Sequence, residues 1–578
     1  MNRSTLARRY LPLAAVVMVQ LLIIAVVPSK APRSGDQLAA TGGGVGGAET
    51  GAVDPATGAP LTDATGGAAT GAGGTAGGAA GGARTGAAGA TAASGAKGDV
   101  SHCIDGRQFN PAIDYYAPPC VPKFTGKNPG ATYQGVTADT ITLVDYYDKG
   151  NDAVNAILQA QGSYVSADQQ AAMDKAAEKF INEHYELYGR KVKIELFQGT
   201  CQSIPPDLKC LRPEMDQIVK DKHPYFVKWN TSLCSACYDE LSALKTPNAG
   251  GWHFRDQFSQ ARRPYHWDEM MSGTTMAKHF GEWWCASLAK KPAKYAGTQN
   301  PADLINGRQR LLGVISTNDP ENQGSVTKDL APELAKCGES FGDRTYYYEQ
   351  NINTVETQRV QAVGKMRGNG TPGSEATSVL CLCDLVAPQF LYEEEQQERY
   401  WPENLIAGSG LMDRDPSGQS YEGSVACPTP GEGCEYDLAF GLSSISNPEK
   451  KDADVGTRVW KAAGMSGATP AESQANSHDW EYWNLIATLI QSSGPTLTPQ
   501  NMDAGVRQYG MRGGGATGHV LRGFPAGSYA WNQDMRLVFF SKGKPSPYNG
   551  DPGTYVQVGD RFTLGGYRPG DPPIPTQR

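Results

Sequence analysis

Residues 135–145 read Gly-Val-Thr-Ala-Asp-Thr-Ile-Thr-Leu-Val-Asp, and the last six of them, Thr140 to Asp145, predict a short buried strand. A helix-rich stretch follows from Asp168 to Tyr188, where apolar residues recur at helical spacing. The alternation continues with strands at 191–197 and 225–229 and helices at 214–222 and 237–244. Strands separated by helices predict parallel pairing with right-handed crossovers.

The alternation of strands and helices begins again after a long predicted helix, Met271 to Leu288. It gives strands at 311–316, 345–349, 377–384 and 404–408, with helices at 325–336, 353–366 and 388–400. A return strand at 436–443, helices at 455–463 and 480–492, and a strand at 535–540 complete the pattern. Two βα blocks, each with its own mostly parallel sheet, predict two α/β lobes, the second mainly at about 285–440.

Four segments of the chain carry a family resemblance. They are Gly135 to Leu143; Leu312-Gly313-Val314-Ile315-Ser316; Tyr400-Trp401-Pro402-Glu403-Asn404; and Gly515-Ala516-Thr517-Gly518-His519-Val520, which precedes a closing stretch from Trp531 to Phe540. In order and spacing they resemble the type I periplasmic-binding-protein fold, in particular the branched-chain-amino-acid-binding (leucine-binding-like) solute-binding proteins of ABC transporters. The resemblance covers residues 134–541 and implies a ligand cleft between the two lobes.

The N-terminal 33 residues have the order of an export signal. Arg3, Arg8 and Arg9 precede an apolar run from Leu11 to Val27, which as a helix would span roughly 25 Å. Retention of this run as a membrane anchor places the rest of the chain outside the cytoplasm. The small-residue sequence Ser29-Lys30-Ala31 leaves cleavage and secretion open. We expect retention.

The segment 34–98 consists almost entirely of Gly, Ala and Thr and predicts a disordered linker. About sixty flexible residues span roughly 45 Å, which suits a tether between an anchor and a domain. Composition drift in a GC-rich genome is the alternative explanation. A cysteine-bearing extension at 99–133 precedes the two-lobed domain at 134–541, and a Pro/Gly-rich tail occupies 542–578.

Twelve cysteines all follow the linker, and an even number in an exported chain predicts disulfides. Local spacing favours the pairs Cys103–Cys120, Cys201–Cys210 and Cys427–Cys434, with Cys285–Cys337 as a longer candidate. Cys234, Cys237, Cys381 and Cys383 remain. Structural disulfides are the favoured interpretation for them, with a four-thiolate zinc site or a CxxC redox site as alternatives.

Ligand contacts in the first lobe are expected beyond the carboxyl ends of its strands. Asn230, Thr231 and Ser232 follow the third strand and precede a helix, so they could hold the carboxylate of a zwitterion, or simply cap the helix. Tyr265, His266 and Trp267 lie in the predicted loop before the long helix. They could stack on a ligand or pack as a plug at the hinge.

In the second lobe, the loop after the first strand holds Asp319, Asn322 and Gln323 as candidate ligand contacts. Asp384 and Asp413 follow later strands. Either carboxylate could neutralise the ammonium group of a ligand; the alternative is a turn-forming aspartate.

Several functions lack support in the sequence. The formal net charge is −8 and no long basic run occurs beyond the extreme N-terminus, so nucleic-acid binding is not expected. The pattern Gly513-x-Gly515-x-x-Gly518 matches a dinucleotide fingerprint but lacks a preceding strand. No nucleophile elbow, paired-histidine zinc helix or phosphate-binding Walker loop occurs. We expect a non-enzymatic protein without cofactor or metal.

The favoured interpretation is an extracytoplasmic receptor that captures a small polar ligand, amino-acid-like, and delivers it to an ABC permease. A membrane-tethered sensor or cell-envelope interaction protein with the same fold is the alternative, because fold alone does not separate the two.

Overall fold

The computed structural model describes residues 98–568 except 149, 230–233, 298–304, 423–435 and 437–438. The predicted anchor, almost all of the linker, Asn230, Thr231, Ser232, Cys427 and Cys434 lie outside the described residues. Within the described chain, no helix is both long enough and apolar enough to cross a membrane. All described residues belong to one compact unit.

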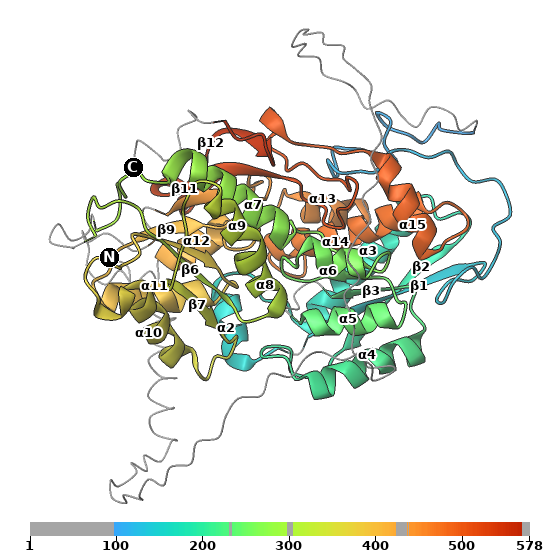
Figure 1. Ribbon diagram of the computed structural model, residues 1–578. Helices are drawn as coiled ribbons and strands as arrows, with labels where there is room; N and C mark the ends of the chain where they lie inside the picture. Colours follow the sequence, from blue (N-terminus) through green and yellow to red (C-terminus); the bar gives the residue numbers. More distant parts are fainter. Residues whose placement is uncertain are drawn as a thin grey trace, which may run out of the picture. The chain divides into compact units, whose positions relative to one another are not determined.

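The first lobe is built on a five-stranded parallel sheet (Figure 1). Its strand order is β2-β1-β3-β4-β5, with bounds Lys191–Gln198, Thr140–Tyr147, Phe226–Trp229, Asn248–Gly250 and His266–Trp267. Its helices are α2 (Asp152–Ala160), α3 (Ala167–His184), α4 (Leu208–Lys222), α5 (Ser235–Ala243) and α6 (Asp256–Ala261). β1 lies next to both β2 and β3, so the strand predicted from residues 140–145 is central to this sheet.

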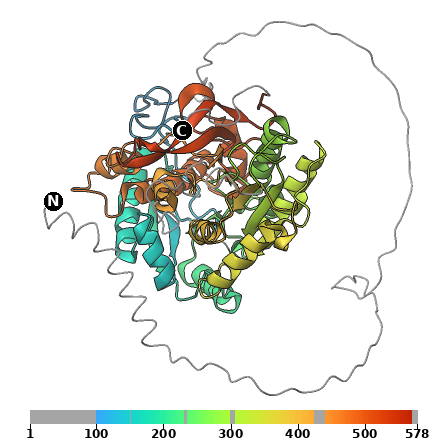
Figure 2. The same cartoon turned by 90° about the vertical axis from the view of Figure 1, so that its left-hand side faces the viewer.

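The second lobe is built on a seven-stranded sheet, ordered β12-β11-β10-β9-β8-β6-β7. The parallel strands are β6 (Leu312–Thr317), β7 (Thr345–Tyr348), β8 (Ser378–Leu382), β9 (Glu403–Ile406) and β10 (Phe440–Ser443). The antiparallel pair β11 (Asp534–Pro545) and β12 (Pro552–Thr563) is drawn in red in both views (Figures 1 and 2). The segment 542–578 was predicted to be a Pro/Gly-rich tail, but it contains β12, which forms because β11 supplies its hydrogen-bonding partner.

The helices of the second lobe are α7 (Gly273–Trp283), α8 (Pro320–Gly324), α9 (Ala331–Ala335), α10 (Val355–Met366), α11 (Ala387–Gln397) and α12 (Asp415–Glu422). The sequence predicts one helix over 271–288. In the structure, Ser272 caps α7 by accepting from the backbone N–H of Thr275, and the chain continues after Trp283 as a π-helix over Trp284–Leu288. The α-helical part is therefore shorter at both ends.

The chain returns to the first lobe after β10. The helices α13 (Val455–Ala462), α14 (Ser473–Ser492) and α15 (Pro499–Val506) share one buried core with β1, β2 and α3. α14 begins seven residues before its predicted start, at Ser473 rather than Trp480. Residues 473–479 are polar except for Ala475, so no apolar periodicity marks the start of this helix.

Three connections between the lobes run through the described chain, and they contact one another. Asp268, after β5, pairs with Ala530 in the connection before β11. Asn532 of that connection donates to the backbone carbonyl of Ser444, which follows β10. These contacts hold the three connections together as a hinge.

The extension at 99–133 packs on the first lobe. The buried carboxylate of Asp114 accepts hydrogen bonds from Trp480 Nε1 and Asn484 Nδ2 of α14, at 2.8 and 2.5 Å. The hydroxyl of Tyr116 donates to the carbonyl of Val520 at 2.6 Å. Cys103 and Cys120 are joined within the extension.

Candidate functional site

A cavity of about 270 Å³ lies between the two lobes. The first lobe contributes the end of β1, the loop after it, α2, α3 and α14. The second lobe contributes the end of β7, the start of α10 and the turn between β8 and α11. The cavity therefore lies beyond the carboxyl ends of parallel strands from both sheets, where ligands bind in open α/β folds.

Most of the cavity wall is apolar or aromatic. Val154, Leu158, Met173, Ile315, Leu385 and Leu391 line it together with the rings of Tyr146, Tyr147, Tyr164, Trp252, Tyr348 and Phe390. The volume and the apolar wall suit the body of a small organic ligand.

Carboxylates line the cavity from both lobes. Asp145, Asp148 and Asp479 belong to the first lobe, and Glu349 and Asp384 to the second. The cavity also contains two arginines. Arg359 pairs with Glu356, Glu393 and Glu394, whereas Arg414 donates to the carbonyl of Gly410 and contacts His478.

Asp145 and Asp479 are held by a buried lysine on β3. Lys228 Nζ lies 2.7 Å from Asp145 Oδ2, 2.5 Å from Asp479 Oδ1 and 3.9 Å from Asp174 Oδ1, and it lies over the ring of Trp483. Burial raises the pKa of Asp145, against the opposing effect of Lys228, and raises that of Asp174 further. The three carboxylates raise the pKa of Lys228 although burial acts in the opposite direction. The ammonium group is therefore fixed in its charged form.

Asp384 and Asp148 face the cavity without such a partner. Asp384 accepts from the hydroxyl of Tyr348, the amide of Gln350 and the backbone N–H groups of Val386 and Ala387, at 2.8–3.0 Å. Asp148 accepts from the backbone N–H of Gly150, and burial raises its pKa to about 6, with a further contribution from Glu214. Neither carboxylate forms an ion pair with any other residue that the structure describes.

Of the predicted ligand contacts in the described chain, Asp384 lines the cavity. Asp413 lines a second cavity of about 140 Å³ near the hinge, which shares Arg414, Gln474 and His478 with the first. One oxygen of Asp413 accepts from the N–H of Gly410, and the other, Oδ2, is buried without a hydrogen-bond partner among the described residues.

The aromatic trio at 265–267 does not reach the cavity. The sequence predicts a loop there, but His266 and Trp267 form the edge strand β5 and are fully buried. His266 packs among Tyr238, Phe254 and Phe258 and bonds to Asn248, while Trp267 packs against Phe524 and Tyr529. Tyr265 precedes the strand and pairs its carbonyl with the N–H of Asn248. The structure therefore gives these residues a packing role.

The loop after β6 lies at a direct contact between the lobes. Asp319 caps α8 and accepts a hydrogen bond from Ser235 Oγ of the first lobe at 2.9 Å. Asn322 is buried and donates to Thr317, and Gln323 is half-buried and donates to the carbonyl of Asn318. Asp319 thus helps to hold the lobes together, and none of the three lines the larger cavity.

Five disulfides join cysteines of the described chain. They are Cys103–Cys120, Cys201–Cys210, Cys234–Cys237, Cys285–Cys337 and Cys381–Cys383. Pairing within Cys234–Cys237 and within Cys381–Cys383 leaves these four sulfurs without the thiolate form that the alternative zinc site requires.

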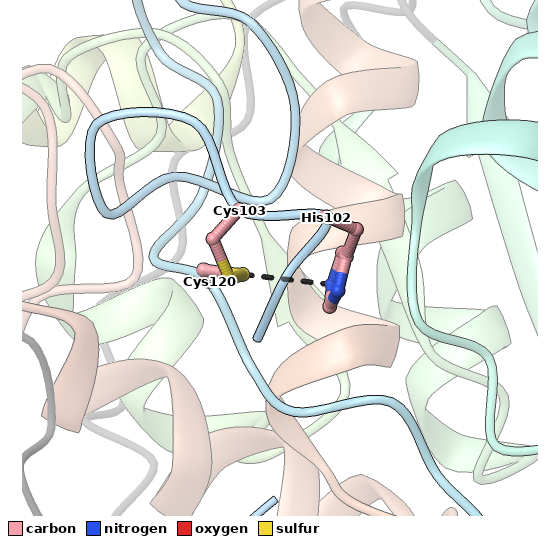
Figure 3. Close-up of side chains that lie close together, drawn as sticks. All are labelled: His102, Cys103 and Cys120. Carbon is pink, nitrogen blue, oxygen red and sulfur yellow. Dashed lines mark hydrogen bonds between the residues drawn. A yellow bond between two sulfur atoms is a disulfide. The ribbon is translucent and has the colours of Figure 1, made fainter. Parts of the chain in front are cut away.

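Three groups of side chains in the described chain are close enough to share a metal ion. In the first, His102 Nε2 lies 3.5 Å from Cys120 Sγ, but that sulfur is bonded to Cys103 (Figure 3). In the second, Lys228 already lies among Asp145, Asp174 and Asp479. In the third, Arg522 binds Glu269 and Glu481 beside His478. Each group therefore has a disulfide or a cation where a metal would be bound.

Most of the residues that line the cavity were not among the predicted ligand contacts. Tyr146, Tyr147 and Asp148 directly follow the predicted strand 140–145, so the rule that ligands bind at carboxyl ends could have selected them. Lys228 and Asp479 carried no such signal, because their contact joins positions 251 residues apart.

Two parallel-dominated sheets, joined by adjacent connections, flank a ligand-sized cavity. The two-lobed architecture expected from the resemblance to type I periplasmic binding proteins is confirmed. No protein-family model matches the sequence. No curated protein matches it either.

Solved structures with a similar fold include solute-binding proteins of ABC transporters. A branched-chain amino acid ABC transporter protein from Thermus thermophilus, solved with bound valine, has a TM-score of 0.49 and 10% identity, covering 74% of this chain and 97% of that one. A substrate-binding protein from Aeropyrum pernix has a TM-score of 0.48 and 13% identity, with coverages of 74% and 96%. A solute-binding protein from R. palustris, in complex with 4-hydroxybenzoate, has a TM-score of 0.47 and 10% identity, with coverages of 74% and 98%.

Proposed function

We propose that this chain is an extracytoplasmic solute-binding receptor that closes its two lobes over a small organic ligand. The observation that carries the proposal is the cavity of about 270 Å³ lined by residues of both lobes. A ligand that contacts both walls stabilises the closed arrangement by its differential affinity for it, and a two-lobed receptor works in this way.

The ligand is proposed to have an apolar body and a polar end, as an amino-acid-like molecule does. The aromatic wall suits the body, and the negative charge of Asp384, which lines the cavity, would offset that of an ammonium group. The residues expected to hold a carboxylate, Asn230 to Ser232, lie outside the described chain. Delivery to an ABC permease and retention on the membrane through residues 11–27 belong to the same proposal.

The test is ligand capture by the purified full chain. Native mass spectrometry should detect a small molecule that co-purifies with it, and calorimetry should then give its affinity. Asp384→Asn should weaken binding roughly tenfold, the scale of one lost charged hydrogen bond. Asp343→Asn, on an exposed loop of the same lobe, is the matched control. Unchanged affinity in Asp384→Asn would place the ligand elsewhere.

A further inference from the structure

The two walls of the interlobe cavity carry charge of the same sign. Asp148 lines it from the first lobe and Asp384 from the second, and Glu349 lines it from the second lobe at an exposed position. The described chain offers none of the three an ion-pair partner within 4.0 Å. The charge of Lys228 compensates Asp145 and Asp479, so these two carboxylates add little to the net negative charge of the cavity.

The cavity arginines do not cancel the excess. Arg359 already faces three carboxylates, at 2.6, 3.0 and 3.4 Å. Arg414 is one cation, bound to the carbonyl of Gly410 and to His478, and it faces the hinge cavity as well. Among the residues that the structure describes, both walls of the cavity therefore carry excess negative charge.

We infer that the charge of the ligand gates closure: this receptor selects a protonated amine with an apolar body, and the amine offsets the repulsion between the two walls. The inference rests on the proposed function. Closure brings like charges together in a partly dry cavity, where their repulsion is stronger than in water. A cation between the walls removes that cost, whereas an anion adds to it. The rings of Tyr146, Tyr147, Trp252 and Tyr348 supply faces that also attract a cation.

The first experiment measures closure without any ligand. Spin labels on genetically encoded side chains at Lys209 in α4 and Val360 in α10 report the distance between the lobes in the full chain. Both positions are exposed and lie on different lobes. Asp148→Asn should raise the ratio of closed to open molecules roughly fivefold, which corresponds to about 1 kcal/mol of repulsion removed. Glu349→Gln should raise the same ratio by a smaller factor, because the side chain of Glu349 is exposed and water screens its charge. Asp560→Asn, at an exposed position of β12, should leave the ratio unchanged.

The second experiment compares three probes that share one apolar body. 2-Phenylethylamine carries only the amine, phenylalanine carries the amine and a carboxylate, and 3-phenylpropanoate carries only the carboxylate. The inference predicts that 2-phenylethylamine closes the lobes and that 3-phenylpropanoate does not. Closure by 3-phenylpropanoate would overturn the inference. So would a ligand-free distance between the lobes that is the same in the parent and in both neutralising variants.

The two proposals fail in different ways. If a co-purified neutral or anionic ligand closes the lobes, the chain is a receptor and the charge gate is wrong. If no probe and no co-purified molecule changes the distance, and the neutralising variants do not change it either, both are wrong. Thermal unfolding of each variant shows whether a changed distance reflects closure or loss of the fold.

Discussion

At the scale of single residues, buried charge shapes the first lobe. Lys228 is fully buried, and each of its charged partners lies on a different element: Asp145 on β1, Asp174 on α3 and Asp479 on α14. A charge without its partner is very costly in such a place, whereas an exposed pair contributes little. The stability contributions of a buried and an exposed lysine can be compared within the sheet of the first lobe.

Lys228→Met should reduce the free energy of unfolding by about 3–5 kcal/mol, because it leaves buried carboxylates without a cation. Lys193→Met on β2, in the same sheet, removes an exposed ion pair with Glu195 and should change the free energy of unfolding far less than Lys228→Met does. Denaturant unfolding of the two variants gives the comparison. Equal losses would mean that the Lys228 cluster is solvated.

Asp148 should make ligand binding depend on pH. Burial raises its pKa to about 6, so the carboxylate is ionised above that pH and neutral below it. Affinity for a cationic ligand should therefore weaken as the pH falls through about 6. Glu214, Tyr146 and Tyr147 surround this carboxylate. Calorimetry with 2-phenylethylamine between pH 5 and pH 8 gives the profile, and Asp148→Asn should flatten it. A profile that persists in that variant would implicate another group.

At the scale of elements, two of the disulfides link segments that precede and follow a connection. Cys201–Cys210 joins the chain after β2 to α4 around the prolines Pro205 and Pro206, and Cys285–Cys337 joins the helices that flank β6. Both fall where the chain leaves regular structure, so each limits the freedom of an unfolded segment.

Replacing Cys201 and Cys210 together with serine should reduce the free energy of unfolding by about 2.7 kcal/mol in the chain-entropy model. Non-reducing peptide mapping of the exported parent protein should recover the two cysteines in one linked fragment. Free thiols at both positions would contradict the pairing, and an unchanged midpoint in the serine variant would contradict its contribution.

At the scale of the whole molecule, the hinge contains two buried carboxyl groups whose pKa values are raised, and one of them, Glu269, also binds Arg522. Asp268 and Glu269 follow β5 in the first connection between the lobes. Burial raises the pKa of Asp268 to about 7 and that of Glu269 to about 8. Asp268 donates its backbone N–H to the carbonyl of Tyr529 in a second connection. Asp268 therefore lies where two connections of the hinge contact each other.

These groups should make global stability depend on pH. Their pKa values are higher in the folded state than in the unfolded state, where aspartate and glutamate titrate near 4. The stability they contribute is full below about pH 4 and is lost as the pH rises through about 7 to 8. Asp268→Asn should reduce the change in the free energy of unfolding with pH. Unfolding by denaturant at pH 4, 6 and 8 in the parent and the variant checks the prediction. The same dependence of unfolding free energy on pH in the parent and the variant would show that Asp268 does not contribute to it.

The sequence by itself determined the alternation of strands and helices in both lobes. The strands β1, β6 and β8 were predictable because their signals are local: apolar runs of strand length between helical patterns. Local spacing also predicted the pairs Cys103–Cys120 and Cys201–Cys210, which the structure contains. Asp384 was predictable as a residue at the carboxyl end of a strand.

Only the tertiary structure decided what surrounds the ligand cavity. β4 and β5 have only three and two residues, so no local sequence pattern marks them. They form because neighbouring strands supply their hydrogen-bonding partners. This pairing places His266 and Trp267 in the buried core. The cavity joins Asp148 to Glu349 and Asp384, which belong to different lobes. Which side chains face one another across that space depends on how two sheets are placed, and a sequence pattern with a range of one helix or strand does not contain that information.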